Sequence, residues 1–188
     1  MLTKEFERFL AQFSGNAGEV DQRVRFLRDI DVLSTVRGRY APDINPEQMA
    51  AMILSLVSRR ASDAAKVTPE AMKLRIVGRE GVPSDLVGKS LQECLAGFIT
   101  DPAAAEYVGA VRFEIAETGK IARLIFRDGT TALFTNDAHI RESVSSSAEL
   151  YSAAALDGCY RLLVIGIGFL KAAATELAEA NEEGEIIA

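Results

Sequence analysis

Arginines in the first third of the chain are the side chains whose type and spacing best suit a chemical role. Seven of the eight arginines there form a cluster: Arg23, Arg25, Arg28, Arg37, Arg39, Arg59 and Arg60. A guanidinium group presents a planar fork of donors that matches phosphate oxygens, and such contacts position a protein on duplex DNA. The run Arg37-Gly38-Arg39-Tyr40 adds a flexible glycine and an aromatic ring to two of these forks. The candidate DNA-binding residues are therefore Arg25, Arg28, Arg37, Arg39 and Tyr40.

The same arginines have a second interpretation, as partners of carboxylates on a solvated face. The nearby acids are Asp21, Asp29, Asp31 and Asp43. Residues 1–67 hold ten Lys/Arg and nine Asp/Glu, whereas residues 68–188 hold eleven and eighteen, so the two parts carry about +1 and −7. Nucleic acid repels the acidic part, so only the first part suits a polyanion. The acidic part would instead suit a basic protein partner.

Catalytic, metal-binding and redox chemistry have few candidate residues. His139 is the only histidine, and neither Cys94 nor Cys159 has a CxxC partner. Two buried, reduced thiols are expected rather than a disulfide or a thiolate zinc site. We expect no catalytic residues, no metal site and no cofactor.

A glycine pair near the C-terminus has the context of a phosphate-binding turn. Gly166-Ile167-Gly168 follows a predicted strand and opens a predicted helix, but Lys171 stands where a dinucleotide-binding turn needs its third glycine. We expect these glycines instead to let the helix pack tightly on its strand.

The elements that must position the arginines are helices. Phe6, Phe9, Leu10 and Phe13 recur at helical spacing, and a second apolar stripe predicts a helix over residues 19–33. A capping box at 45–48, with proline at the first helical position, predicts the start of a third helix. Residues 1–67 therefore form a predicted three-helix, helix-turn-helix-like module, although the link between its last two helices is longer than the usual turn.

Residues 68–188 combine strands with helices. A short strand is expected at 73–77, a capping box at 90–93 opens a helix, and alternating apolar residues predict strands at 111–115, 121–126 and 130–135. Asp128-Gly129 predicts a hairpin, because both residues can adopt positive φ. A helix at 148–156, a strand at 159–165, a helix at 166–180 and a frayed acidic tail at 181–184 follow. The predicted class is α+β, with an antiparallel meander, a C-terminal helix and a dimerisation or partner surface.

The sequence also predicts a cytoplasmic protein with no membrane partner. The first seven residues already include Glu5 and Glu7, and no apolar core of a signal peptide follows them. The longest apolar run, 162–170, has nine residues, whereas a membrane span needs roughly 18 or more.

Residues 23–56 resemble a group of small, mostly uncharacterised proteins of bacteriophages, prophages and related bacterial chromosomes. The matching stretches are Val24-Arg25-Phe26-Leu27-Arg28, Arg37-Gly38-Arg39-Tyr40-Ala41-Pro42 and Ala50-Ala51-Met52-Ile53-Leu54. The chain departs from that pattern at Asp31, where glycine is usual, and at Val36. The resemblance implies a helical, DNA-binding N-terminal module in a phage-related setting, and it brings no catalytic residues.

Two functions follow as expectations. The first is a non-enzymatic, phage-type protein that binds double-stranded DNA as a transcriptional regulator and forms a homo-oligomer. The alternative is an interaction or assembly protein that binds a host or phage protein, such as a small terminase-like packaging component or an anti-defence inhibitor.

Overall fold

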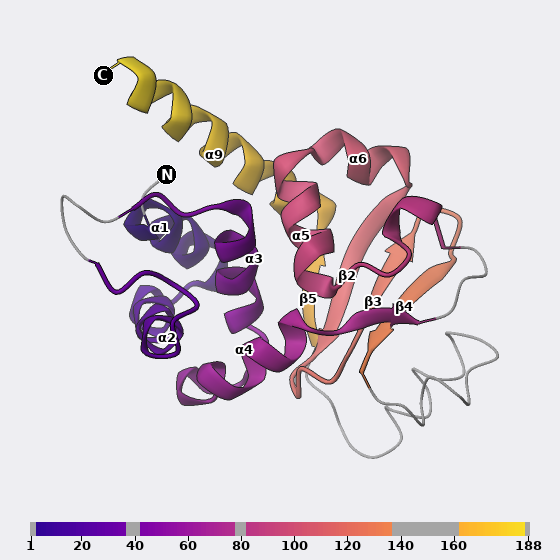
Figure 1. Ribbon diagram of the computed structural model, residues 1–188, viewed down its shortest axis with the longest axis horizontal. Helices are drawn as coiled ribbons and strands as arrows, with labels where there is room; N and C mark the ends of the chain where they lie inside the picture. The colour runs from indigo at the N-terminus through magenta and orange to yellow at the C-terminus, as the bar shows by residue number, and fades with distance from the viewer. Residues whose placement is uncertain (1–2, 37–41, 78–81, 137–161, 187–188) are drawn as a thin grey trace.

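The computed structural model describes residues 3–36, 42–77, 82–136 and 162–186, and it has the mixed α+β architecture that the sequence predicts. These ranges hold seven α-helices and a five-stranded antiparallel sheet. Four helices gather beside one end of the sheet, and α5 covers one of its faces (Figure 1). The predicted helix at 148–156, His139, Cys159, Arg37, Arg39 and Tyr40 lie outside the described residues.

The helical lobe consists of α1 (Thr3–Ser14), α2 (Ala17–Asp29), α3 (Pro46–Ser55) and α4 (Ala64–Met72). The predicted apolar stripe of α1 is confirmed, because Phe6, Phe9 and Leu10 are buried. Every residue of α3 from Met49 to Ser55 is buried as well. This central helix therefore forms the core of the lobe.

The predicted start of α3 is confirmed in detail. The Asn45 side chain accepts a hydrogen bond from the Gln48 amide, and the Gln48 side chain accepts one from the Asn45 amide. Pro46 occupies the first turn, where its missing N–H costs nothing. The local signals alone therefore fix where this helix begins.

The end of α2 differs from the prediction. The helix stops at Asp29 instead of residue 33, and Asp31 adopts a φ of 57°. This left-handed conformation favours glycine, and aspartate tolerates it better than most residues.

The sheet has the strand order β1-β4-β3-β2-β5. Its strands are β1 (Arg75–Val77), β2 (Ala110–Ala116), β3 (Ile121–Phe126), β4 (Thr131–Thr135) and β5 (Leu162–Gly166). The predicted meander β2-β3-β4 is confirmed, and β5 pairs with β2 across the register Phe113↔Ile165. Phe113 packs against Phe98 of α5 (Leu91–Thr100), with ring centroids 5.9 Å apart, so the α5 side of the sheet holds the core.

The predicted β3–β4 hairpin is confirmed. Only Gly129, with a φ of 86°, is in the left-handed region, and Asp128 is not. The Gly129 amide donates to the Phe126 carbonyl at 3.1 Å, and the Phe126 amide donates to the Thr130 carbonyl at 3.0 Å. This pattern fits a three-residue loop with one left-handed glycine, the next most common hairpin after the two-residue turn.

The C-terminal helix is longer than predicted. α9 runs from Ile167 to Ile186 and includes residues 181–184, which the sequence predicted as a frayed tail. Its first turns are buried near α6 (Pro102–Tyr107) through the side chains of Ile167, Leu170 and Ala173. Its far end projects from the body of the protein (Figure 1).

The helical lobe and the sheet share one hydrophobic core. A single buried cluster contains Leu27 and Met52 of the lobe together with Phe98, Phe113 and Leu170. The predicted domain boundary at 67/68 lies inside α4. Gly119 in the β2–β3 turn also packs onto this helix, because a Cβ there would lie 2.8 Å from the Val67 carbonyl oxygen. The division into two domains stays a prediction.

Candidate functional site

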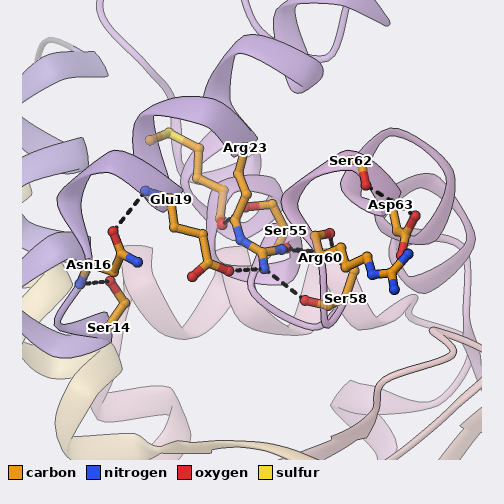
Figure 2. A network of polar contacts seen from close by, with 10 residues as sticks. Ser14, Asn16, Glu19, Arg23, Ser55, Ser58, Arg60, Ser62 and Asp63 are labelled. Atoms are coloured by element: carbon orange, nitrogen blue, oxygen red, sulfur yellow. Dashed lines mark hydrogen bonds and ion pairs between the residues drawn. The ribbon is translucent and has the colours of Figure 1, made fainter.

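Arg23, one of the seven arginines, is an internal strut of the helical lobe. Its side chain is 2% exposed, and one of its nitrogens donates to the Ser55 carbonyl and to Ser58 Oγ at 2.7 Å (Figure 2). The other donates to the Ser58 carbonyl at 2.8 Å and to Glu19 at 2.5 Å. The guanidinium therefore satisfies carbonyls at the C-terminal end of α3, where a cation is favoured.

Arg28 is also turned inward. Its Nη2 lies 3.2 Å from Glu7 Oε1, and each of the two side chains is 12% exposed. Burial raises the pKa of the Glu7 carboxyl, and the Arg28 charge offsets that effect only in part. This ion pair joins α1 to α2, and a phosphate could reach Arg28 only by breaking it.

Three others of these seven arginines face solvent. Arg25 is 63% exposed and pairs with Asp21 at 2.6 Å, one helical turn earlier. Arg59 and Arg60 are exposed, and neither has an ion pair with any described residue. Among the candidate DNA-binding residues, Arg25 thus points outward and Arg28 inward. The spacings Glu19–Arg23 and Asp21–Arg25 are the sequence signal for these pairs.

A pocket lies elsewhere, between the helical lobe and the edge of the sheet. We call it the β5 pocket, and its volume is about 440 Å³. Its wall on the helical side contains Phe13, Ser14, Glu19, Val20, Arg23, Ile53 and Leu56, and its other wall contains Leu163, Val164, Ile165 and Phe169. The volume falls in the range of pockets that bind ligands, roughly 300–1,000 Å³.

The lining shows where the pocket runs relative to the sheet. Leu163, Val164 and Ile165 are consecutive residues of β5, and their side chains alternate between the two faces. A pocket that touches all three must therefore lie along the edge of the strand. The strand neighbour of β5 among the described residues is β2, on the opposite edge.

Exposed apolar side chains line the mouth of the β5 pocket. Phe13 is 56% exposed and Val164 is 55% exposed. The Phe13 ring meets Phe169 edge-on with centroids 4.8 Å apart, and Phe9 packs beside both rings. These rings join α1 to α9 and form an apolar platform next to the strand.

Glu19 is the charged group of the pocket that remains partly exposed, at 40%. Asn16 caps α2 by accepting from the Glu19 amide at 3.1 Å, which fixes the backbone that carries this carboxylate (Figure 2). Oε1 of Glu19 accepts from Arg23, and its Oε2 has no partner among the described residues. One carboxylate oxygen is therefore available to a cation.

The glycine pair at the start of α9 does not pack as the sequence predicted. A Cβ at either Gly166 or Gly168 would meet nothing within 4 Å. Close packing of helix on strand therefore does not explain these glycines. Bare backbone of this kind instead permits another chain to approach closely.

A second charged cluster lies on the sheet face opposite α5. Glu114 is 5% exposed and accepts from Arg112 Nε at 2.8 Å and from Arg123 Nε at 2.7 Å. Burial by itself would raise the pKa of Glu114, but the hydrogen bonds and charges of the two arginines outweigh it and lower the pKa. The carboxylate is saturated by its neighbours, so this cluster serves the sheet.

Reactive side chains are few among the described residues. Cys94 is buried, as predicted, and burial raises the pKa of its thiol to about 12. No group of three His, Cys, Asp or Glu side chains within the described ranges could hold a metal ion. Within those same ranges no helix has the length and apolar character to cross a bilayer.

No protein-family model matches the chain, and no curated protein and no solved structure is similar to it.

Proposed function

We propose that the chain is a non-enzymatic interaction protein that holds a segment of another protein in the β5 pocket. The observation that carries this proposal is the position of the pocket, which follows a strand edge and is walled by exposed apolar side chains such as Phe13 and Val164. Apolar patches at a concave site are the usual mark of a binding surface. A packaging component and an inhibitor of a host protein both need such a surface.

Site-specific photo-crosslinking tests this proposal. A photoreactive phenylalanine analogue replaces Phe13 at the pocket or, as a matched control, Tyr107 on α6, which is 87% exposed. Each variant is produced in the organism's own cells, and mass spectrometry identifies the crosslinked polypeptide and its crosslinked residue. We expect one segment of one partner from position 13 and none from position 107. Absent or equal crosslinking at the two positions would contradict the proposal.

DNA binding by the helical lobe is a second candidate, with regulation of transcription as its purpose. The exposure of Arg25, Arg59 and Arg60 favours it, since these cations remain accessible to phosphate. Under this candidate α2 and α3 act as a helix-turn-helix variant, and Arg37, Arg39 and Tyr40 supply further contacts.

Duplex binding at low salt tests the second candidate. Real binding falls steeply as salt rises, because phosphate contacts release counterions. Arg59→Ala/Arg60→Ala and Arg37→Ala/Arg39→Ala should each weaken binding. Lys89→Ala/Arg127→Ala, at two exposed positions outside the helical lobe, also removes two positive charges and serves as the control. A wild type that does not bind, or binding unaffected by both double variants, excludes this function.

A further inference from the structure

We infer that β5 receives an extended, basic peptide as a sixth strand of the sheet, with an apolar side chain of that peptide seated in the β5 pocket. This inference rests on the proposed interaction function and names the kind of segment that is bound. It depends on three features of the described residues: an open strand edge, a space of suitable shape, and a carboxylate with one unused oxygen.

The two edges of the sheet differ in how they are covered. β1 is only three residues long, and the chain that follows it protects its outer side. The Ile76 amide donates to the Lys89 carbonyl at 3.3 Å, and Arg75 forms a bridge with Ser90. Natural sheets protect their edges in this way because unpaired backbone groups attract further strands.

β5 has no such protection among the described residues. It is five residues long, it pairs with β2, and its backbone makes no hydrogen bond toward the helical lobe. Alternate residues of β5 therefore present N–H and C=O groups to the β5 pocket. An added strand would satisfy them, and such main-chain bonds supply affinity while side-chain pockets supply specificity.

The shape of the site favours a single extended chain over the sheet of a second copy. Ser14, Glu19 and Leu56 belong to the helical lobe and form the wall that faces β5. A strand needs about 4.8 Å of lateral room beside its neighbour, whereas a whole sheet would meet the lobe. The open space at Gly166 and Gly168 lets the backbone of a peptide approach the end of β5.

The side chains of the site indicate the composition of the peptide. Phe13, Val164 and Phe169 suit an apolar anchor, aromatic or branched. The unused Oε2 of Glu19 and the net charge of −6 favour lysine or arginine beside that anchor. In a strand, alternate residues face the same side, so the basic and apolar positions should alternate along the peptide.

Selection from a displayed library of random heptapeptides provides the probe. We expect enriched peptides to alternate apolar and basic residues, and the tightest is then synthesised for calorimetry. In an added strand, every second amide of the peptide faces β5. N-methylation of those amides should weaken binding of the peptide by about tenfold or more, and N-methylation of the amides that face away should not.

Variants of the protein test the pocket. Phe13→Ser should weaken binding of the peptide about tenfold, whereas Tyr107→Ser should leave it unchanged. Thermal melts confirm that each variant is folded.

Amide hydrogen exchange distinguishes strand addition from non-specific binding of the peptide to an apolar surface. The bound peptide should slow exchange of amides within 162–166 and leave those of β1 unchanged. No enrichment over the Phe13→Ser variant, or binding without protection of β5, would overturn the inference. A partner segment crosslinked at position 13 without protection of β5 would preserve the proposed function and refute only strand addition.

Discussion

The helical lobe and the β5 edge use their polar groups in opposite ways. The lobe holds most of the chain's clustered positive charge, yet it directs Arg23 and Arg28 inward onto carbonyls and a carboxylate. β5 contains no charged side chain, yet among the described residues nothing pairs with the backbone donors and acceptors of its outer edge. The comparison teaches that the count of charges in a segment does not locate its binding capacity, since what matters is which polar groups folding leaves unsatisfied.

The largest effect that tests this contrast is the loss of the Arg23 strut. Arg23→Ala removes hydrogen bonds to Ser55, Ser58 and Glu19 in a buried place, and it should lower the free energy of unfolding by about 3 kcal/mol. Arg25→Ala is the matched control, because an exposed pair contributes at most about 0.5 kcal/mol. Urea unfolding measures both. Equal losses would mean that Arg23 is not a structural group.

The junction between the lobe and the sheet gives the next largest effect. Gly119 has a φ of 67° and lies against Val67, so Gly119→Ala adds both backbone strain and a clash. We expect a loss of about 2–3 kcal/mol, against about 1 kcal/mol for Gly129→Ala, whose φ is 86° but whose surroundings are open. Thermal melts of the two variants test this order, and a smaller loss at position 119 would refute the packing of the turn on α4.

The two buried carboxylates should respond to pH with opposite signs. The raised pKa of Glu7 means that the folded state binds a proton more readily than the unfolded state, so this contribution is full below pH 4.5 and is lost as pH rises through the folded pKa. The lowered pKa of Glu114 gives stability above pH 4.5 that is lost as pH falls through its folded pKa. The free energies of unfolding of the wild type, Glu7→Gln and Glu114→Gln, measured between pH 3 and 7, separate the two contributions. Changes of the same sign in both variants would contradict the account.

The smallest expected effect concerns the turn after α2. Asp31→Gly relieves the left-handed strain at a φ of 57° and should stabilise the protein by about 0.5–1 kcal/mol. Asp29→Gly, inside the helix end, should instead destabilise it by a similar amount. A destabilising Asp31→Gly would show that the aspartate side chain has a role of its own.

Local signals predicted most of the elements. Short-range signals can be recognised in the sequence because they act within a few residues. They include the capping residues Asn45 and Ser90 and the apolar alternation in β2 to β4. The extent of α9 was missed because its glycine and acids suggested a tail, whereas the helix continues through them.

The candidate site was not predictable in the same way. The β5 pocket joins Phe13, Leu56 and Val164, which only the tertiary fold brings together. The burial of Arg23 was missed because an arginine is rarely a core residue, although Glu19 stands one turn before it. The apolar residues of 159–165 did predict a strand, but which edge of the sheet stays open depends on strand order, which local patterns do not encode.

Parallel amide-exchange measurements with the selected heptapeptide and with a random-sequence duplex test the central claim most directly. Our account predicts that the peptide slows exchange across 162–166, while the duplex leaves the amides of Arg25, Arg59 and Arg60 unchanged. Protection of those arginines by the duplex, lost steeply with salt, together with unaltered exchange in β5 for every library peptide, would contradict it.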